Sequence, residues 1–306
     1  MNLLYYTAAD DGARWLEAIA RDLPEARVRV WPGAGTQADY ALVWKPPTAM
    51  IAELSSARAV FNLGAGVDAL VGLPAWPSSV PLIRLEDAGM SEQMAEYVTY
   101  AVLRRYREFD AYQRAQLAAD WRPRARLDKG AFNVGILGFG VLGAAVAKAL
   151  GALGFTVSAW SRSRKYVQGV RSFTCDELDP FLASSNVLVC MLPLTPQTRD
   201  LLDRSRLARL PQGAYVINIS RGALIVERDL LALIDVGHLC GAMLDVFDDE
   251  PLARAHAFWH HPQITVTPHI SAATRVDESV RQVAAKIRRL EAGLPVSGIV
   301  DAAHAY

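Results

Sequence analysis

Three residues in the second half of the chain have the chemistry needed to reduce a carbonyl group. Arg221, Glu250 and His269 each follow a short apolar run, respectively AYVINI, GAML and ITV. An arginine guanidinium can bind a carboxylate together with a neighbouring carbonyl oxygen, and it polarises that carbonyl toward attack by hydride. A histidine can donate a proton to the alkoxide that forms, while a carboxylate orients the ring and favours its protonated form. This combination suits the reduction of a 2-keto acid.

A glycine-rich segment indicates a nucleotide cofactor. Gly138, Gly140 and Gly143 follow the apolar run FNVGIL and open the helical pattern VLGAAVAKAL. In such a context the first glycine makes a tight turn, the second admits a pyrophosphate close to the backbone, and the third lets helix and strand pack closely. The phosphates would lie at the helix N-terminus, beside Val141, Leu142 and Gly143. The alternative interpretation is an ordinary turn between a strand and a helix.

The end of the next apolar run, TVSAW, indicates which nucleotide is used. NAD enzymes usually carry an acidic residue there for the ribose 2′-hydroxyl. Here the run continues with Ser161, Arg162, Ser163, Arg164 and Lys165, so the position has no acid. Two guanidinium groups and an ammonium group can pair with a 2′-phosphate. The sequence therefore predicts NADPH, with weaker use of NADH; the alternative is a solvated basic turn.

The elements that must position these residues fall into two α/β series. In the first, strand patterns are MNLLYY, ARVRVW, YALVW, AVFNLG and PLIRL, with a helix over 13–23. In the second, the strand patterns are NVGILG, TVSAW, VLVCML, AYVINI, GAMLDV and ITVTP. Alternation of strands and helices predicts parallel sheets covered on both faces, with the chemistry at the carboxyl ends of the strands. Two such series predict two lobes with a ligand-binding cleft between them.

Helical patterns link and follow the two series. One long helix is predicted over 91–118, a polar connection over 125–131, and a last helix over 275–291.

Bulk composition excludes several classes of protein. The 306 residues include 32 basic and 32 acidic side chains, so no net charge attracts the molecule to nucleic acid or anionic lipid. No apolar stretch approaches the roughly 18 residues needed to span a bilayer, and the N-terminus lacks the features of a signal peptide. Cys175, Cys190 and Cys240 are predicted to be reduced core residues of a cytoplasmic protein. His260 and His261 have no third ligand nearby, so no metal site is expected.

Several other residues have less specific predictions. His238, His256 and His304 are expected at the surface or at helix ends. Trp44 either packs beside the cleft or contacts the substrate, and Arg84 is a weaker candidate for substrate contact.

Four motifs together resemble one enzyme family. GFGVLG, INISRGALI, AMLDVFDDEPL and TPHIS occur in the order and at the spacing of the D-2-hydroxyacid dehydrogenases. Five further segments, DYALVWKPP, VFNLGAGVDAL, RLEDAGMSEQMAEYV, AWSRSRK and GIVDAAHAY, resemble the members that reduce glyoxylate and hydroxypyruvate. The resemblance covers essentially the whole chain.

The resemblance implies a role for each of Arg221, Glu250 and His269, which together are called the reactive set. Arg221 would bind and polarise the substrate, His269 would donate the proton, and Glu250 would be the carboxylate partner of His269. Asp245 and the segment at Pro193 would line the nicotinamide pocket.

In the other lobe, the resemblance implies that backbone N–H groups of Gly64, Ala65 and Gly66 bind the substrate carboxylate. It also implies a flavodoxin-like substrate domain formed by 1–98 and 276–306, and a doubly wound Rossmann-type cofactor domain over 99–275. The helix near Ser91 would contribute to a homodimer.

The chain differs from parts of the family at three points and leaves two alternatives open. Ser161 replaces the common acidic residue, and Glu250 separates the chain from formate dehydrogenases, which carry glutamine there. The chain also lacks the C-terminal regulatory extension of many phosphoglycerate dehydrogenases.

The size of the substrate is the first alternative. The orientation of Trp44, Met90 and the Trp259 turn decides between a small keto acid and a bulkier one such as an aryl-pyruvate. A dinucleotide-sensing corepressor is the alternative from another class, although it would not need the reactive set.

Overall fold

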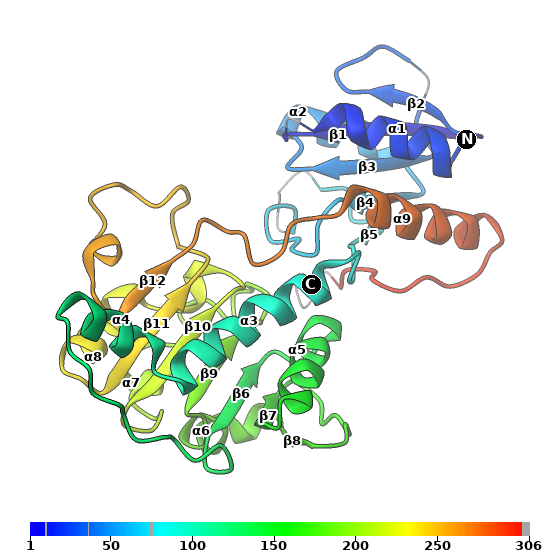
Figure 1. Cartoon of the computed structure of the whole chain (residues 1–306). Helices are drawn as coiled ribbons and strands as arrows, with labels where there is room; N and C mark the ends of the chain where they lie inside the picture. The colour runs from blue at the N-terminus through cyan, green and yellow to red at the C-terminus, as the bar shows by residue number, and fades with distance from the viewer. Residues whose placement is uncertain (10, 36, 72, 74–75, 302–306) are drawn as a thin grey trace. The chain divides into compact units, whose positions relative to one another are not determined.

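The computed structural model describes residues 1–9, 11–35, 37–71, 73 and 76–301, and His304 lies outside the described residues. The chain forms two compact units (Figure 1). The terminal unit combines Met1–Met90 with Thr274–Tyr306, and the central unit is Ser91–Ala273.

The central unit contains a parallel sheet in the Rossmann strand order. The order is β12-β11-β10-β9-β6-β7-β8, which reads 3-2-1-4-5-6 from β8 to β11 with β12 added at the edge. The strands are β6 (Asn133–Leu137), β7 (Thr156–Trp160), β8 (Val170–Phe173), β9 (Val187–Cys190), β10 (Ala214–Asn218), β11 (Leu239–Leu244) and β12 (Ile264–Val266). The helices are α3 (Met90–Tyr106), α4 (Phe109–Leu117), α5 (Val141–Ala152), α6 (Leu178–Ala183), α7 (Arg204–Leu207) and α8 (Glu227–Asp235), with 3-10 turns at Cys175–Glu177, Gly222–Leu224 and Ala257–His260.

The central sheet is doubly wound, with helices packed on both of its faces, because its strands carry apolar side chains on both faces. Successive residues of a strand point to opposite faces, so an almost continuous apolar run is buried on both sides. In β9, Val187 and Val189 join the cluster formed with α3 and α5, whereas Leu188 and Cys190 join the cluster formed with α6 and α8. All neighbouring strands of this sheet are paired in parallel, so the carboxyl ends of its seven strands lie at one edge of a covered sheet.

The terminal unit contains a smaller parallel sheet in the flavodoxin order, β2-β1-β3-β4-β5. Its strands are β1 (Asn2–Thr7), β2 (Arg27–Val30), β3 (Tyr40–Trp44), β4 (Ala59–Asn62) and β5 (Leu82–Ile83). Its helices are α1 (Gly12–Asp22), α2 (Thr48–Ile51) and α9 (Val276–Glu291), with a 3-10 turn at Ala52–Ser56. The two strand orders confirm the predicted fold class, a Rossmann-type sheet and a flavodoxin-like sheet.

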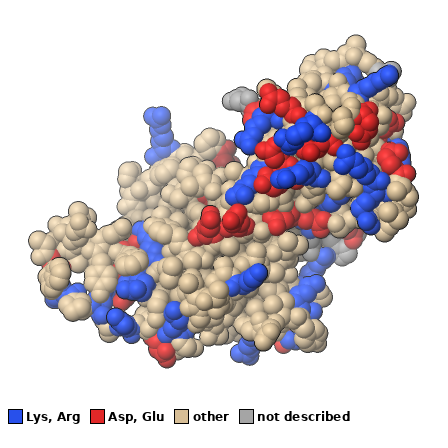
Figure 2. All heavy atoms as spheres, turned by 45° about the vertical axis from the view of Figure 1, so that its right-hand side comes forward, with Lys and Arg blue, Asp and Glu red and all other residues tan. Residues whose placement is uncertain are grey.

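The C-terminal part of the chain completes the terminal unit. Val280, Val283 and Ile287 of α9 are fully buried, and Asp277 at its start forms ion pairs with Arg14 and Arg21 of α1. Such pairs are part of a surface on which positive and negative side chains are interspersed (Figure 2). Beyond α9, residues 298–300 add an antiparallel bridge and backbone hydrogen bonds to the edge strand β5.

The structure corrects three details of the sequence interpretation. The predicted helix over 91–118 is two helices, because Glu108 adopts a left-handed conformation (φ 54°) between α3 and α4. Ion pairs of Glu108 with Arg124 and of Asp110 with Arg104 stabilise this break. The strand β8 was not predicted, since VRSF carries two polar residues among four. Cys175 is exposed, so it is not a core residue, although all three cysteines are free.

Candidate active site

The reactive set lies at the carboxyl ends of three neighbouring strands. Arg221 follows β10, Glu250 lies on the loop after β11, and His269 follows β12; β10, β11 and β12 are adjacent in the sheet. Residues far apart in sequence are thus presented by loops at one edge of the sheet, where open α/β sheets bind their ligands.

His269 and Glu250 form a hydrogen-bonded pair. The distance from His269 Nδ1 to Glu250 Oε2 is 2.8 Å, and the second carboxylate oxygen, Oε1, accepts the N–H of Phe247 at 3.1 Å. His269 has a left-handed backbone (φ 56°) fixed by its N–H, which donates to the carbonyl of Asp245 at 2.8 Å. The His269 side chain remains 47% exposed. The ring is therefore held from one nitrogen, and Nε2 is left as the atom that can exchange a proton with a ligand.

The backbone around Arg221 is held by a buried asparagine. Asn218 is 1% exposed; its amide donates to the carbonyl of Arg221 at 2.9 Å and accepts the N–H of Ser220 at 3.2 Å. Ser220 in turn donates to the carbonyl of Leu192, and Arg221 Nη1 donates to the carbonyl of Ser220 at 2.7 Å. Asn218 was not predicted as a site residue. The sequence signal that could have identified it is a polar residue at the end of an otherwise apolar strand.

Gly222 allows the Arg221 loop to approach the Glu250 loop. A Cβ atom at position 222 would lie 1.9 Å from the carbonyl carbon of Phe247 and 2.2 Å from the nitrogen of Asp248. Only glycine permits two backbone segments to come this close. Contacts therefore connect Arg221, through Gly222 and Phe247, to the carboxylate that holds His269.

Asp245 organises the loop that carries His269. Its carboxylate is fully buried and accepts the Thr267 hydroxyl and the N–H groups of Ile270 and Ser271 at 2.5, 2.8 and 2.7 Å. In this structure the Asp245 side chain positions the loop that carries His269. That it also lines the nicotinamide pocket stays a prediction.

Tyr97 of α3 extends the same network. Because Thr267 donates to Asp245, it must accept from the Tyr97 hydroxyl, which lies 2.6 Å away. Burial, with the nearby negative charge of Asp245 adding to it, raises the pKa of Tyr97 above its usual range, so this hydroxyl stays protonated as a donor. The helix α3 is thereby attached to the strand end that presents His269.

The glycine-rich turn fits a pyrophosphate group. Gly138 has a φ of 110°, and a Cβ atom there would lie 2.6 Å from the backbone of Met191. A Cβ atom on Gly143 would meet the Gly138 carbonyl oxygen at 2.5 Å, whereas nothing lies within 4 Å of one placed on Gly140. The first and third glycines are required by close packing, and the space at Gly140 is open. The N-terminus of α5, with Val141, Leu142 and Gly143 in its first turn, points its N–H groups to this space.

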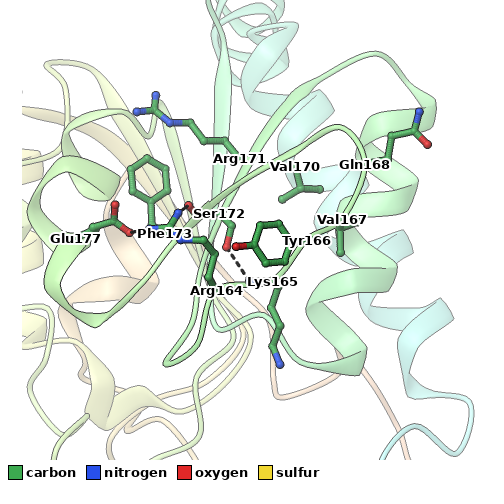
Figure 3. Close-up of a pocket in the computed structure, with 10 residues that line it drawn as sticks. All are labelled: Arg164, Lys165, Tyr166, Val167, Gln168, Val170, Arg171, Ser172, Phe173 and Glu177. Atoms are coloured by element: carbon green, nitrogen blue, oxygen red, sulfur yellow. Dashed lines mark hydrogen bonds and ion pairs between the residues drawn. The ribbon is translucent and has the colours of Figure 1, made fainter.

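The basic turn after β7 is joined to β8 and the 3-10 turn that follows it. Arg164 donates to the Ser172 carbonyl and pairs with Glu177, at 2.6 Å each, and Lys165 N–H donates to the Ser172 hydroxyl (Figure 3). Hydrogen bonds from the backbone N–H and hydroxyl of Thr174 and the proximity of Arg164 lower the pKa of Glu177, so it stays ionised. The assignment of Arg164 to a 2′-phosphate stays a prediction, and in this structure its guanidinium is paired with Glu177.

Two further predicted cofactor residues follow the ends of strands. Ser161 directly follows β7 and donates its hydroxyl to the Ser163 carbonyl at 2.8 Å. A surface pocket beside the basic turn is lined by Lys165, Tyr166 and Arg171 among others (Figure 3). Pro193 follows β9, and its carbonyl accepts the Thr198 hydroxyl at 2.7 Å.

In the terminal unit, the loop of Gly64, Ala65 and Gly66 follows β4. The buried amide of Asn62 donates to the carbonyls of Gly64 and Gly66, at 2.9 and 2.8 Å. The ring of Trp44 packs on Gly64, where a Cβ atom would lie 2.4 Å from it. This agrees with the packing role considered for Trp44.

The contacts and exposure of four other candidates are as follows. The carbonyl of Arg84 accepts Lys286 Nζ at 3.2 Å, and Met90 is 4% exposed. His256 is hydrogen-bonded to Glu227 and His261 to Asp235. Among the described residues there is no group of three or more His, Cys, Asp or Glu side chains that could hold a metal ion.

Comparison with known proteins identifies the class. The model of the "D-isomer specific 2-hydroxyacid dehydrogenase, NAD binding domain" matches residues 99–271. The chain therefore belongs to the D-isomer specific 2-hydroxyacid dehydrogenase family.

Individual relatives are similar over the full length. The glyoxylate/hydroxypyruvate reductase A of Serratia proteamaculans (strain 568) is 46% identical, with 100% of both chains covered. A D-isomer specific 2-hydroxyacid dehydrogenase from Xanthobacter autotrophicus Py2, solved in complex with NADPH and MES, has a TM-score of 0.95 and 41% identity, covering 100% of this chain and 99% of its own. An NADPH-dependent glyoxylate/hydroxypyruvate reductase from Sinorhizobium meliloti, solved with NADP and sulfate, has a TM-score of 0.92 and 34% identity at the same coverage. Among the described residues, no helix is both long and apolar enough to cross a membrane.

Proposed function

We propose that this protein is an NADPH-dependent reductase that converts a small 2-keto acid, glyoxylate or hydroxypyruvate, to the corresponding D-2-hydroxy acid. The observation that carries the proposal is the 2.8 Å pair of His269 and Glu250, linked by backbone contacts to the Arg221 loop. Relatives named as glyoxylate/hydroxypyruvate reductases support the substrate class.

The chain's own residues would divide the work as follows. NADPH, when bound, supplies a hydride to the carbonyl carbon. Arg221 would bind the substrate carboxylate and draw electron density toward the carbonyl oxygen. His269 would transfer the Nε2 proton to that oxygen, and Glu250, on the opposite nitrogen, would stabilise the charged ring before transfer. The products are the hydroxy acid and NADP⁺, and His269 regains its proton from solvent.

The basic turn would select NADPH. Arg162, Arg164 and Lys165 would supply the attraction for the 2′-phosphate. Charge-assisted hydrogen bonds at a partly exposed site predict an NADPH preference of roughly 10- to 100-fold in kcat/KM. Ser161→Asp combined with Arg162→Ala should reverse much of it. Equal use of NADH and NADPH by the unmodified enzyme would contradict the assignment.

We also propose that the protein is a cytoplasmic homodimer. Leu117, at the end of α4, is 90% exposed, and Trp121 shortly after it is 96% exposed, with Phe109 and Tyr112 also exposed on α4. An apolar surface of this kind favours association, and a second copy would cover it. Sedimentation should give a dimer, and Leu117→Ser with Trp121→Ser should shift it toward monomer.

The three free cysteines of the chain favour a reducing compartment such as the cytoplasm.

The direct test is oxidation of NADPH, followed by absorbance at 340 nm, with a panel of keto acids. We expect turnover with glyoxylate and hydroxypyruvate, and D-glycerate as the product from hydroxypyruvate by chiral chromatography. Faster turnover of an aryl-pyruvate would replace the substrate assignment. No turnover with any keto acid, together with tight NADPH binding, would favour a dinucleotide sensor.

A further inference from the structure

We infer that Glu227 is a positioning residue for the reaction: its carboxylate holds the loop that carries Glu250, and through Glu250 it sets the position of the His269 ring. The inference rests on the proposed function. Glu227 is the first residue of α8, and it follows Arg221 in the chain just beyond the 3-10 turn Gly222–Leu224. It therefore stands next to both of the loops that carry the reactive set.

The Glu227 carboxylate contacts the Glu250 loop at two separate points. Its Oε1 atom accepts the N–H of Asp248 in a long hydrogen bond of 3.4 Å, and its Oε2 atom lies 3.1 Å from His256 Nε2. Glu250 lies between these two points in the sequence. One carboxylate thus closes the loop at its base, and bringing the two ends together reduces the conformational freedom of the residues between them.

The hydrogen bond between His256 and Glu227 has a defined direction. His256 Nδ1 lies 3.3 Å from the backbone nitrogen of Phe258, and it accepts that N–H because a backbone N–H can only donate. The neutral ring therefore carries its hydrogen on Nε2, where it donates to Glu227 Oε2. The His256 ring also packs edge-on against the Phe258 ring, with centroids 4.6 Å apart. These contacts orient His256 so that it needs an acceptor at the position of Glu227.

The contact at Asp248 leads directly to the reactive set. The preceding N–H in the chain, that of Phe247, donates to Glu250 Oε1, and Glu250 Oε2 lies 2.8 Å from His269 Nδ1. Consecutive N–H groups of one loop therefore bind Glu250 and Glu227. Release of the loop from Glu227 would let the Phe247 peptide move, and with it Glu250 and the His269 ring.

A second histidine–carboxylate pair of the same kind lies at the other end of α8. His261 Nδ1 accepts the N–H of Gln263 at 3.2 Å, and its Nε2 atom lies 3.2 Å from Oδ1 of Asp235, the last residue of α8. If both pairs only attached this part of the chain to α8, loss of either would have the same effect on the reaction. Because Glu227 is the carboxylate at the base of the Glu250 loop, we expect that only its loss slows the reaction.

The test is steady-state kinetics of Glu227→Gln and Glu227→Asp, with Asp235→Asn as the matched control. An amide has one oxygen, so in Glu227→Gln an N–H₂ group must face either the Asp248 N–H or the His256 Nε2–H. We expect kcat with glyoxylate, per NADPH-binding site, to fall about 10- to 100-fold, because a displacement of about 1 Å in a catalytic group costs on the order of 100-fold. The NADPH dissociation constant should not change. Glu227→Asp keeps both acceptor oxygens and should recover part of the rate, and Asp235→Asn should match wild type.

A second readout does not require turnover. In protein with isotope-labelled histidine, Glu227→Gln should shift the NMR ring signals of His256 and His269, whereas Asp235→Asn should shift that of His261 and leave that of His269 in place. A wild-type kcat in Glu227→Gln, or equal loss of kcat in Glu227→Gln and Asp235→Asn, would overturn the inference and leave Glu227 as a structural residue. If the unmodified enzyme reduces no keto acid, the proposed function is wrong, and the His269 signal then decides by itself whether Glu227 positions the ring.

Discussion

Replacement of Gly222 by alanine should strongly reduce the activity, although it changes none of the side chains of Arg221, Glu250 and His269. The added Cβ would lie 1.9 Å from the carbonyl carbon of Phe247, and ordinary contact begins near 3.4 Å. The Arg221 and Phe247 backbones must therefore separate by roughly 1.5 Å, because backbone on both sides offers no flexible group to give way. The N–H of Phe247 donates a hydrogen bond to Glu250, and Glu250 is hydrogen-bonded to His269. A displacement of Phe247 therefore also displaces His269, the proposed proton donor.

A displacement of about 1 Å in a catalytic group costs on the order of 100-fold in rate. We therefore expect kcat/KM of Gly222→Ala with glyoxylate to fall by about 100-fold or more, while the NADPH dissociation constant, from fluorescence titration, changes little. Gly151→Ala is the matched control. It adds the same methyl group near the end of α5, where nothing lies within 4 Å, and should leave the rate unchanged. Normal kcat/KM in Gly222→Ala would refute the idea that these two loops are held in register by their close approach.

Three further changes test separate parts of the structure. His269→Asn should lower kcat by roughly 10²- to 10⁴-fold with NADPH affinity retained, and a variant with near-normal turnover would remove His269 as proton donor. Arg221→Lys keeps the charge but not the planar fork, so both kcat and KM should worsen; an unchanged kcat would limit Arg221 to binding. Burial opposes ionisation of Glu86, but hydrogen bonds from Ser297 and Lys286 outweigh it and lower its pKa from the usual 4.5. Stability from this group is thus present above pH 4.5 and lost as pH falls through the lower folded pKa, so Glu86→Gln should flatten the decline in unfolding free energy below about pH 4.5, as measured by urea titration.

The sequence was sufficient to predict the architecture, and with it the edge of the sheet at which Arg221, Glu250 and His269 lie. Strand patterns such as VLVC and AYVIN are apolar on both faces, which only a covered parallel sheet can satisfy, and the residues after them must then meet at one edge. The pairing of His269 with Glu250 was implied by the family resemblance, and the structure places the two in hydrogen-bond contact.

The supporting hydrogen bonds could not be predicted in the same way. Asn62 and Asn218 are single polar residues at strand ends, and their roles depend on the path of the loop that follows each strand. The ion pair of Arg164 with Glu177 likewise could not be predicted, because Glu177 lies in a turn beyond the unpredicted strand β8. The break between α3 and α4 at Glu108 likewise depends on an ion pair, because Glu108 is paired with Arg124, which lies beyond α4.

The discontinuous terminal unit has a consequence for the order of events during synthesis. The central unit is one uninterrupted segment, Ser91–Ala273, so it can fold as soon as it leaves the ribosome. The terminal unit begins with the first residues made, yet its α9 contributes Val280, Val283 and Ile287 to the core and is translated last. At the usual translation speed, the β1–β5 sheet waits roughly 10 to 40 s for that helix, with its apolar face available to other chains or to a chaperone. The unit whose synthesis begins first is therefore the unit that is completed last.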